Sequence, residues 1–157
     1  MKLRDSNGKE FLVGIIIFFG LFLYFIYDFT RVYPPLKKYE YSGSMSQFAQ
    51  DLQKISTTNP QIVFDITDTT GSAENGFAYY IKISIKGLKK NNEYYLAYKE
   101  DDSWFSQKET KLNLNGAFDL YRKSGGYKLE DTDVKRLVHL FDQDFYEKLV
   151  REKNTSP

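Results

Sequence analysis

The feature that most constrains this chain is a run of apolar and aromatic residues near its start. Residues 11–27 read FLVGIIIFFGLFLYFIY and carry no charge. A helix rises about 1.5 Å per residue, so such a run spans roughly 25 Å, slightly less than the ~30 Å hydrocarbon core of a bilayer. The flanking Lys9 and Arg31 can reach the two headgroup layers. The sequence therefore predicts a single transmembrane helix over residues 11–28, with membrane lipid as its partner.

Two other interpretations of this run are a cleavable signal peptide and a buried helix of a soluble protein. Lys2, Arg4 and Lys9 resemble the positive region of a signal peptide, but no small residues of the A-x-A type follow the run. A lipoprotein signal requires a cysteine, and the chain has none. The rest of the chain is too small to surround such a helix on all sides. We therefore expect an uncleaved signal anchor.

The orientation of this anchor depends on its flanking charges. Three basic residues precede the run and three follow it closely, so the positive-inside rule gives a tie. The free amino terminus and the ready translocation of long C-terminal segments favour an N-terminus inside the cell. High Lys, Asn, Ile and Tyr with little Pro and Ala is typical of an AT-rich bacterial genome. We expect a single-pass protein of the bacterial inner membrane, with its C-terminal domain extracytoplasmic.

The remaining residues predict one small domain of balanced charge. From Val32 onward the chain holds eighteen basic and eighteen acidic residues, with no basic cluster suited to a phosphate backbone, so nucleic acid is not expected as a partner. Pro34-Pro35 stiffens the segment after the anchor. The predicted segments besides the anchor are an N-terminal tail over 1–10, a spacer over 29–37, a globular domain over 38–153 and a C-terminal tail over 154–157.

The periodicity of apolar residues predicts the elements of the domain. Alternation indicates strands, and segments 77–86 and 93–99 are expected to pair as an antiparallel hairpin. Helical spacing predicts a helix over 45–56, capped by Ser44, and a C-terminal helical part capped by Asp131 or Thr132, as one long helix or two short ones. The other predicted segments are strands over 38–43, 62–67, 104–114 and 117–121, and loops over 68–76 and 124–126.

These elements predict an α+β fold. After the N-terminal transmembrane helix we expect a mostly antiparallel sheet of four to six strands, packed on one face by two or three helices. The apolar face of the first domain helix is expected to comprise Met45, Phe48, Ala49, Leu52 and Ile55. The C-terminal apolar stripe is expected to comprise Val134, Leu137, Val138, Phe141, Phe145, Leu149 and Val150.

The chain offers few residues for catalysis or metal binding. It has no cysteine, and its one histidine, His139, lies on an expected helix, so the usual zinc ligand sets cannot form within one chain. Asp142 and Asp144 are expected on the solvent side of that helix. No phosphate-binding, dinucleotide-binding or calcium-loop motif occurs. We therefore predict no catalytic residues, no cofactor and no metal site.

Tyr80 and Tyr95 are the candidate partner-binding residues. Both fall on the polar faces of the two strongest strands, so pairing of those strands places them on one outer surface of the sheet. Tyrosine is enriched at protein interfaces. The alternative interpretation is that the two rings only support the hairpin by packing across it.

Three functions fit this sequence. We favour a membrane-anchored, non-catalytic binding or assembly domain, an accessory subunit of a membrane or cell-envelope complex with a protein partner at the membrane. One alternative is a membrane-anchored immunity-type protein that neutralises a toxin. The other is a hydrolase that uses dispersed carboxylates such as Asp65, Asp68 and Asp119.

Overall fold

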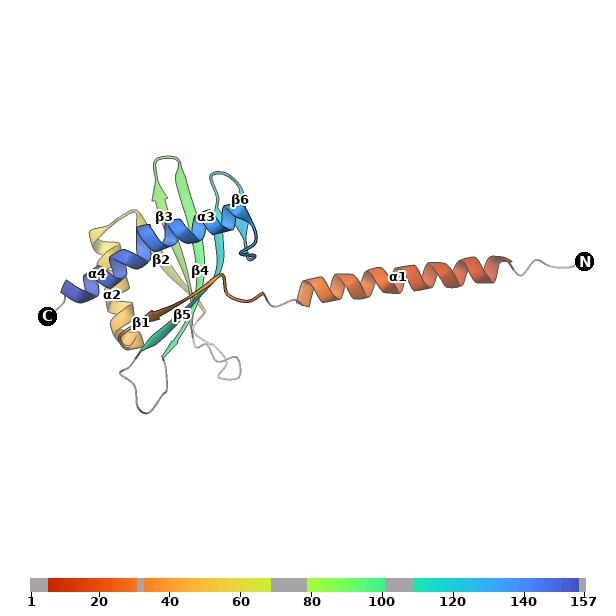
Figure 1. The fold of residues 1–157 in the computed structure, drawn as a ribbon, viewed down its shortest axis with the longest axis horizontal. Coiled ribbons are helices and arrows are strands. Elements are labelled where there is room, and N and C mark those ends of the chain that lie inside the picture. Colours follow the sequence, from red (N-terminus) through yellow and green to blue (C-terminus); the bar gives the residue numbers. More distant parts are fainter. Residues whose placement is uncertain (1–5, 31–32, 69–78, 101–108, 156–157) are drawn as a thin grey trace, which may run out of the picture. The chain divides into compact units, whose positions relative to one another are not determined.

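The computed structural model describes residues 6–30, 33–68, 79–100 and 109–155 (Figure 1). The chain divides into two compact units, Met1–Val32 and Tyr33–Pro157.

The first unit contains one helix, α1 (Ser6–Thr30). Its side chains are described for residues 13–26, and the large apolar ones among them are 41–69% exposed. Within the described part of the chain, no helix is long and apolar enough to cross a membrane. The predicted transmembrane helix over 11–28 therefore has no support from this finding, and the membrane and envelope assignments remain predictions.

The second unit is built on a six-stranded sheet in which every pairing is antiparallel. The strand order is β1-β5-β4-β3-β2, and β6 pairs with β5. The prediction of an α+β domain with an antiparallel sheet of four to six strands is thus confirmed. The strands are β1 (Lys37–Tyr41), β2 (Ile62–Asp68), β3 (Tyr79–Gly87), β4 (Lys90–Glu100), β5 (Thr110–Asp119) and β6 (Ser124–Gly126).

The predicted hairpin is confirmed in β3 and β4. Gly87 pairs with Lys90, so the connecting turn consists of Leu88 and Lys89. Residues of β3 that face the helices are almost fully buried, as the alternation in the sequence requires. They are Ile81, Ile83 and Ile85, which are 1%, 0% and 4% exposed.

Strand β5 corrects two predictions. The structure has one strand where the sequence indicated two, because a bulge at Asn115 lets the pairing with β4 continue. Leu96 pairs with Leu114 and Tyr95 pairs with Gly116, which leaves Asn115 as the extra residue. Segment 124–126, predicted as a loop, is the short strand β6 that pairs with β5. Residues 104–108 of the first predicted strand lie outside the described residues, as does most of the predicted loop at 68–76.

Helix α2 (Met45–Thr58) begins at the predicted residue. The Ser44 hydroxyl accepts a hydrogen bond from the backbone N–H of Gln47 at 3.3 Å, which caps the helix. The prediction that Ala49 belongs to the buried face is wrong, because Ala49 is exposed and Asp51 is buried instead. The residues of α2 that enter the core are Phe48, Leu52 and Ile55.

The C-terminal helical part is continuous, with a π-helical turn in its middle. It comprises α3 (Thr132–Phe141), the π turn η2 (Asp142–Tyr146) and α4 (Glu147–Thr155). Asp131 is its N-cap and accepts from the backbone N–H of Asp133 at 2.8 Å. The predicted stripe is confirmed except at Val150, which is 37% exposed. Its fully buried members are Val134, Leu137, Phe141, Phe145 and Leu149.

The helices of the domain cover one face of the sheet (Figure 1). On β4 the side chains of Tyr94, Leu96 and Tyr98 point to that face and are 0–4% exposed. The intervening Tyr95 points to the opposite face and is half-buried. The second face of the sheet is therefore where side chains remain accessible, and it carries the candidate site.

Candidate functional site

The structure brings Tyr80 and Tyr95 together on the open face of the sheet. Tyr80 pairs with Ala97 and Tyr95 pairs with Lys82, so the two tyrosines are diagonal neighbours across the β3–β4 pairing. Both rings are half-buried and line one hollow of about 380 Å³, which we call the tyrosine hollow. The residues that line it are Thr67, Tyr80, Ile81, Tyr95, Leu96, Asn115 and Tyr127.

A third tyrosine, Tyr127, completes the wall of the tyrosine hollow. Its ring stands edge-to-face against Phe118, with 5.1 Å between centroids, and Phe118 in turn stands edge-to-face against Tyr95 at 5.7 Å. This position depends on Gly116, because a Cβ there would lie 2.8 Å from Cε1 of Tyr127. Sequence reasoning missed Tyr127, since it lies beyond the strands in a segment that reads as a loop. Gly116, between the two predicted strands 104–114 and 117–121, was the available signal, because a glycine can mark a bulge or a close approach.

The bulge in β5 supplies the polar side of the tyrosine hollow. Asn115 is the unpaired residue of the bulge, and its side chain lines the hollow beside Tyr80 and Tyr95. A bulge re-aims one side chain relative to the regular alternation of a strand. An amide group and the threonine hydroxyl of Thr67 therefore accompany three phenol rings on an otherwise apolar floor.

The charges near the tyrosine hollow are compensated locally. The Tyr95 hydroxyl donates to Oε2 of Glu93 at 3.1 Å, and Lys82 Nζ lies 4.0 Å from Oε1 of the same carboxylate. Burial, and then the negative charge of Glu93, raises the pKa of Tyr95 above its ordinary value. Tyr95 thus stays protonated and neutral, and the described residues that line the hollow carry no formal charge.

Of the carboxylates considered for hydrolysis, Asp65 and Asp119 do not line this hollow. Asp119 is buried and occupied by structural partners: it accepts from the backbone N–H of Arg122 at 3.0 Å and from Nη2 of Arg136 at 3.3 Å. Asp65 is exposed on β2. The side chain of Asp68 lies outside the described residues. His139 is exposed on α3.

The π turn bears two further carboxylates, and the prediction that they face solvent is wrong. Asp142 accepts from Nζ of Lys37 and from the hydroxyl of Tyr39, both at 2.7 Å. Asp144 pairs with Lys90. Burial, followed by the hydrogen bond to Asp142, raises the pKa of Tyr39. These groups fasten the helix to β1 and β4, and they neutralise one another.

Metal binding has no candidate cluster in residues 6–30, 33–68, 79–100 and 109–155, where no three His, Cys, Asp or Glu side chains are placed to hold an ion. Comparisons of this chain with protein-family models, with curated proteins and with solved structures found no match.

Proposed function

We propose that this chain is a membrane-anchored, non-catalytic binding domain, an accessory subunit of a bacterial envelope complex. Residues 11–28 anchor it in the inner membrane, and the domain after the anchor lies outside the cytoplasm. A protein partner docks on the tyrosine hollow. The observation that carries this proposal is the hollow itself, a neutral aromatic depression on the sheet face that the helices leave uncovered.

We propose the anchor from the surface of α1, although no helix among the described residues reaches the length and apolarity of a membrane span. Helix α1 contains 25 residues, and its large apolar side chains from Val13 to Ile26 are exposed all round. A helix that is apolar on every side is stable only where it is buried or surrounded by lipid. A bilayer would remove this surface from water, at a gain of about 25 cal/mol per Å² of apolar area.

A protein partner is supported by the chemistry of the tyrosine hollow. Tyrosine offers a large rigid ring and a polar end, and such residues dominate the energetics of protein interfaces. The hollow is large enough to receive one or two side chains of a partner. Because the described residues of its lining have no formal charge, a partner that fills the hollow has no ion among them to desolvate.

Site-specific photocrosslinking in native membranes tests this proposal. A benzoylphenylalanine in place of Tyr95 keeps an aromatic ring in the hollow and is expected to give one discrete adduct with another protein. The matched control is the same group in place of Tyr121, an exposed tyrosine outside the hollow. The double change Tyr80→Ser and Tyr95→Ser should leave the circular dichroism spectrum unchanged and should abolish co-purification of the crosslinked partner.

The proposal is refuted if position 95 gives no adduct, or gives only those that position 121 also gives. It is also refuted if the double serine variant retains the partner at the wild-type level. An adduct of twice the mass of the chain would replace the envelope partner by a second copy of this protein.

A further inference from the structure

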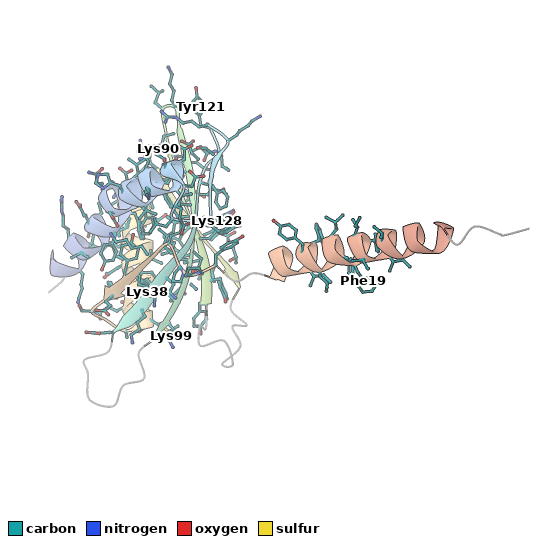
Figure 2. All side chains as sticks on the ribbon, turned by 45° about the vertical axis from the view of Figure 1, so that its right-hand side comes forward. Phe19, Lys38, Lys90, Lys99, Tyr121 and Lys128 are labelled. Atoms are coloured by element: carbon teal, nitrogen blue, oxygen red, sulfur yellow. The ribbon has the colours of Figure 1, made fainter. Side chains whose placement is uncertain are left out.

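Two turns that are far apart in the sequence lie at the same end of the sheet. The first is the β3–β4 turn at Leu88-Lys89, and the second connects β5 to β6 over residues 120–123. They are neighbours because Asn92 pairs with Asp119 and the backbone N–H of Leu120 donates to the carbonyl of Asn91 at 2.8 Å. Lys90 and Tyr121 accordingly appear at the same end of the domain (Figure 2). We call residues 86–90 and 120–123 the basic tip.

The basic tip exposes apolar side chains at its most projecting points. Leu88 is 97% exposed, Tyr121 is 59% exposed and Leu120 is 44% exposed. A leucine in a two-residue hairpin turn gives nothing to the core. Asparagine and glycine would form such a turn more readily.

The basic tip also concentrates positive charge. It contains five basic residues and no acidic one: Lys86, Lys89, Lys90, Arg122 and Lys123. Lys90 is paired with Asp144, and Arg122 lies 3.9 Å from Asp119. Lys86, Lys89 and Lys123 have no ion-pair partner in the part of the chain that the structure describes. The domain as a whole is neutral, but its basic tip therefore carries a net positive charge.

The backbone conformation of the basic tip is a third unusual feature. Lys89 and Lys123 have φ angles of +57° and +54°, in the left-handed region that favours glycine and asparagine. They are the non-glycine residues with positive φ among the described ones. Each turn thus holds a lysine in a backbone conformation that disfavours residues with a Cβ. The cationic side chains are not explained by the folding of the turns.

We infer that the basic tip is a second membrane contact, in which the domain binds the surface of an anionic bilayer. Leu88, Leu120 and Tyr121 enter the headgroup layer, where leucine buries apolar area and tyrosine suits the interface. The lysines around them are attracted to lipid phosphates. Anionic lipid is favoured because the lysines match its negative headgroups, while the exposed apolar side chains they surround match the acyl chains beneath. This contact is distinct from the partner hollow and goes beyond the proposed function.

Tyr33 lies against residues that follow the second turn of the basic tip. Tyr33, the first residue of the second unit, lines a shallow hollow with Gly125 and Gly126, and Nζ of Lys128 lies 4.9 Å from the centroid of its ring. These residues belong to β6 and its C-terminal continuation, and β6 directly follows the second turn of the basic tip.

The experiment uses the full chain in lipid nanodiscs and a fluorescent label at Gly87→Cys. The chain has no natural cysteine, and a Cβ at Gly87 would meet its nearest atom, Cβ of Lys90, at 3.7 Å, so the substitution itself causes no clash in the tip. Discs of phosphatidylcholine are compared with discs that also contain phosphatidylglycerol. The control label is at Gln53→Cys, an exposed position on α2.

The expected result is a blue shift of the label at position 87 in phosphatidylglycerol discs, absent in phosphatidylcholine discs and absent at position 53. Added salt should reduce the shift, because exposed charges are screened. The change Lys89→Glu with Lys123→Glu should weaken the response to phosphatidylglycerol by at least about tenfold, with an unchanged circular dichroism spectrum.

Equal spectra in the two kinds of disc would overturn the inference, as would a shift that survives the charge reversal. A shift produced in phosphatidylcholine discs by soluble polyphosphate would overturn the assignment to lipid. Co-elution of the chain with the discs reports on the anchor separately, so failure of the anchor and failure of the tip are distinguishable.

Discussion

Replacing Tyr41 by phenylalanine removes one hydroxyl group from the core and leaves the Asp51 carboxylate without its tyrosine donor. Tyr41 is 1% exposed and Asp51 is 7% exposed, and the phenol donates to Oδ2 of Asp51 at 2.5 Å. The ring of Tyr41 packs edge-to-face on Phe48, with 5.4 Å between centroids. Phenylalanine keeps this packing, so the change isolates the hydrogen bond between β1 and α2.

The expected cost follows from the burial of both partners. A hydrogen bond to a charged group contributes about 1.5–3 kcal/mol, and a buried acceptor left without its partner loses stabilisation of the same order. Because Asp51 is almost inaccessible to water, solvent replaces the lost donor poorly. We expect Tyr41→Phe to lower the free energy of unfolding by about 2 kcal/mol. For a domain of this size the midpoint of thermal unfolding would fall by about 8 °C.

Urea unfolding of the full chain in mild detergent, followed by circular dichroism, measures this change. Tyr41→Phe combined with Asp51→Leu removes both polar partners, and should recover part of the loss because no carboxylate is left unpaired. Tyr121→Phe is the control, since Tyr121 is exposed and should change stability by less than about 0.5 kcal/mol. A loss below about 0.5 kcal/mol for Tyr41→Phe, or strictly additive effects of the two changes, would refute this reasoning.

Two further predictions follow from the tyrosines. Burial raises the pKa values of Tyr39, Tyr41 and Tyr94. Their stabilising contribution is therefore complete below pH ~10, and above it each tyrosine loses about 1.4 kcal/mol of this contribution per pH unit. The urea midpoint should fall as the pH rises from about 9 to about 11, and an unchanged midpoint would contradict this prediction. Gly116→Ala should displace the Tyr127 ring and reduce crosslinking from position 95 severalfold, whereas the control Gly87→Ala should not, because its Cβ meets nothing nearer than 3.7 Å.

Local rules in the sequence are sufficient for most elements of this domain. Ser44 and Asp131 cap the helices that follow them, as their side chains and positions predict. The isoleucines of β3 alternate strictly, so their burial on one face follows from the period of a strand. Because Tyr80 and Tyr95 lie on paired strands, their common face was also predictable.

The tyrosine hollow itself could not be predicted from local pattern. It needs Tyr127 to fold back over Gly116, a contact between a strand and the segment after the next strand. It also needs the bulge at Asn115, and a bulge appears in the sequence only as weakened alternation. Likewise Asp51 lies outside the predicted apolar face of α2, and its burial depends on a donor that β1 supplies.

The π turn explains why the two carboxylates of the C-terminal helix were misplaced. Phe141, Phe145 and Leu149 follow one another at intervals of four residues, which in a regular helix moves each about 40° further round the axis. A wider turn over Asp142–Tyr146 takes up this drift, so Phe141 and Phe145 both remain fully buried. The same turn directs Asp142 toward Lys37 and Tyr39 of β1, and Asp144 toward Lys90 of β4. Positions that a regular helix assigns to solvent therefore form ion pairs between the helix and the sheet.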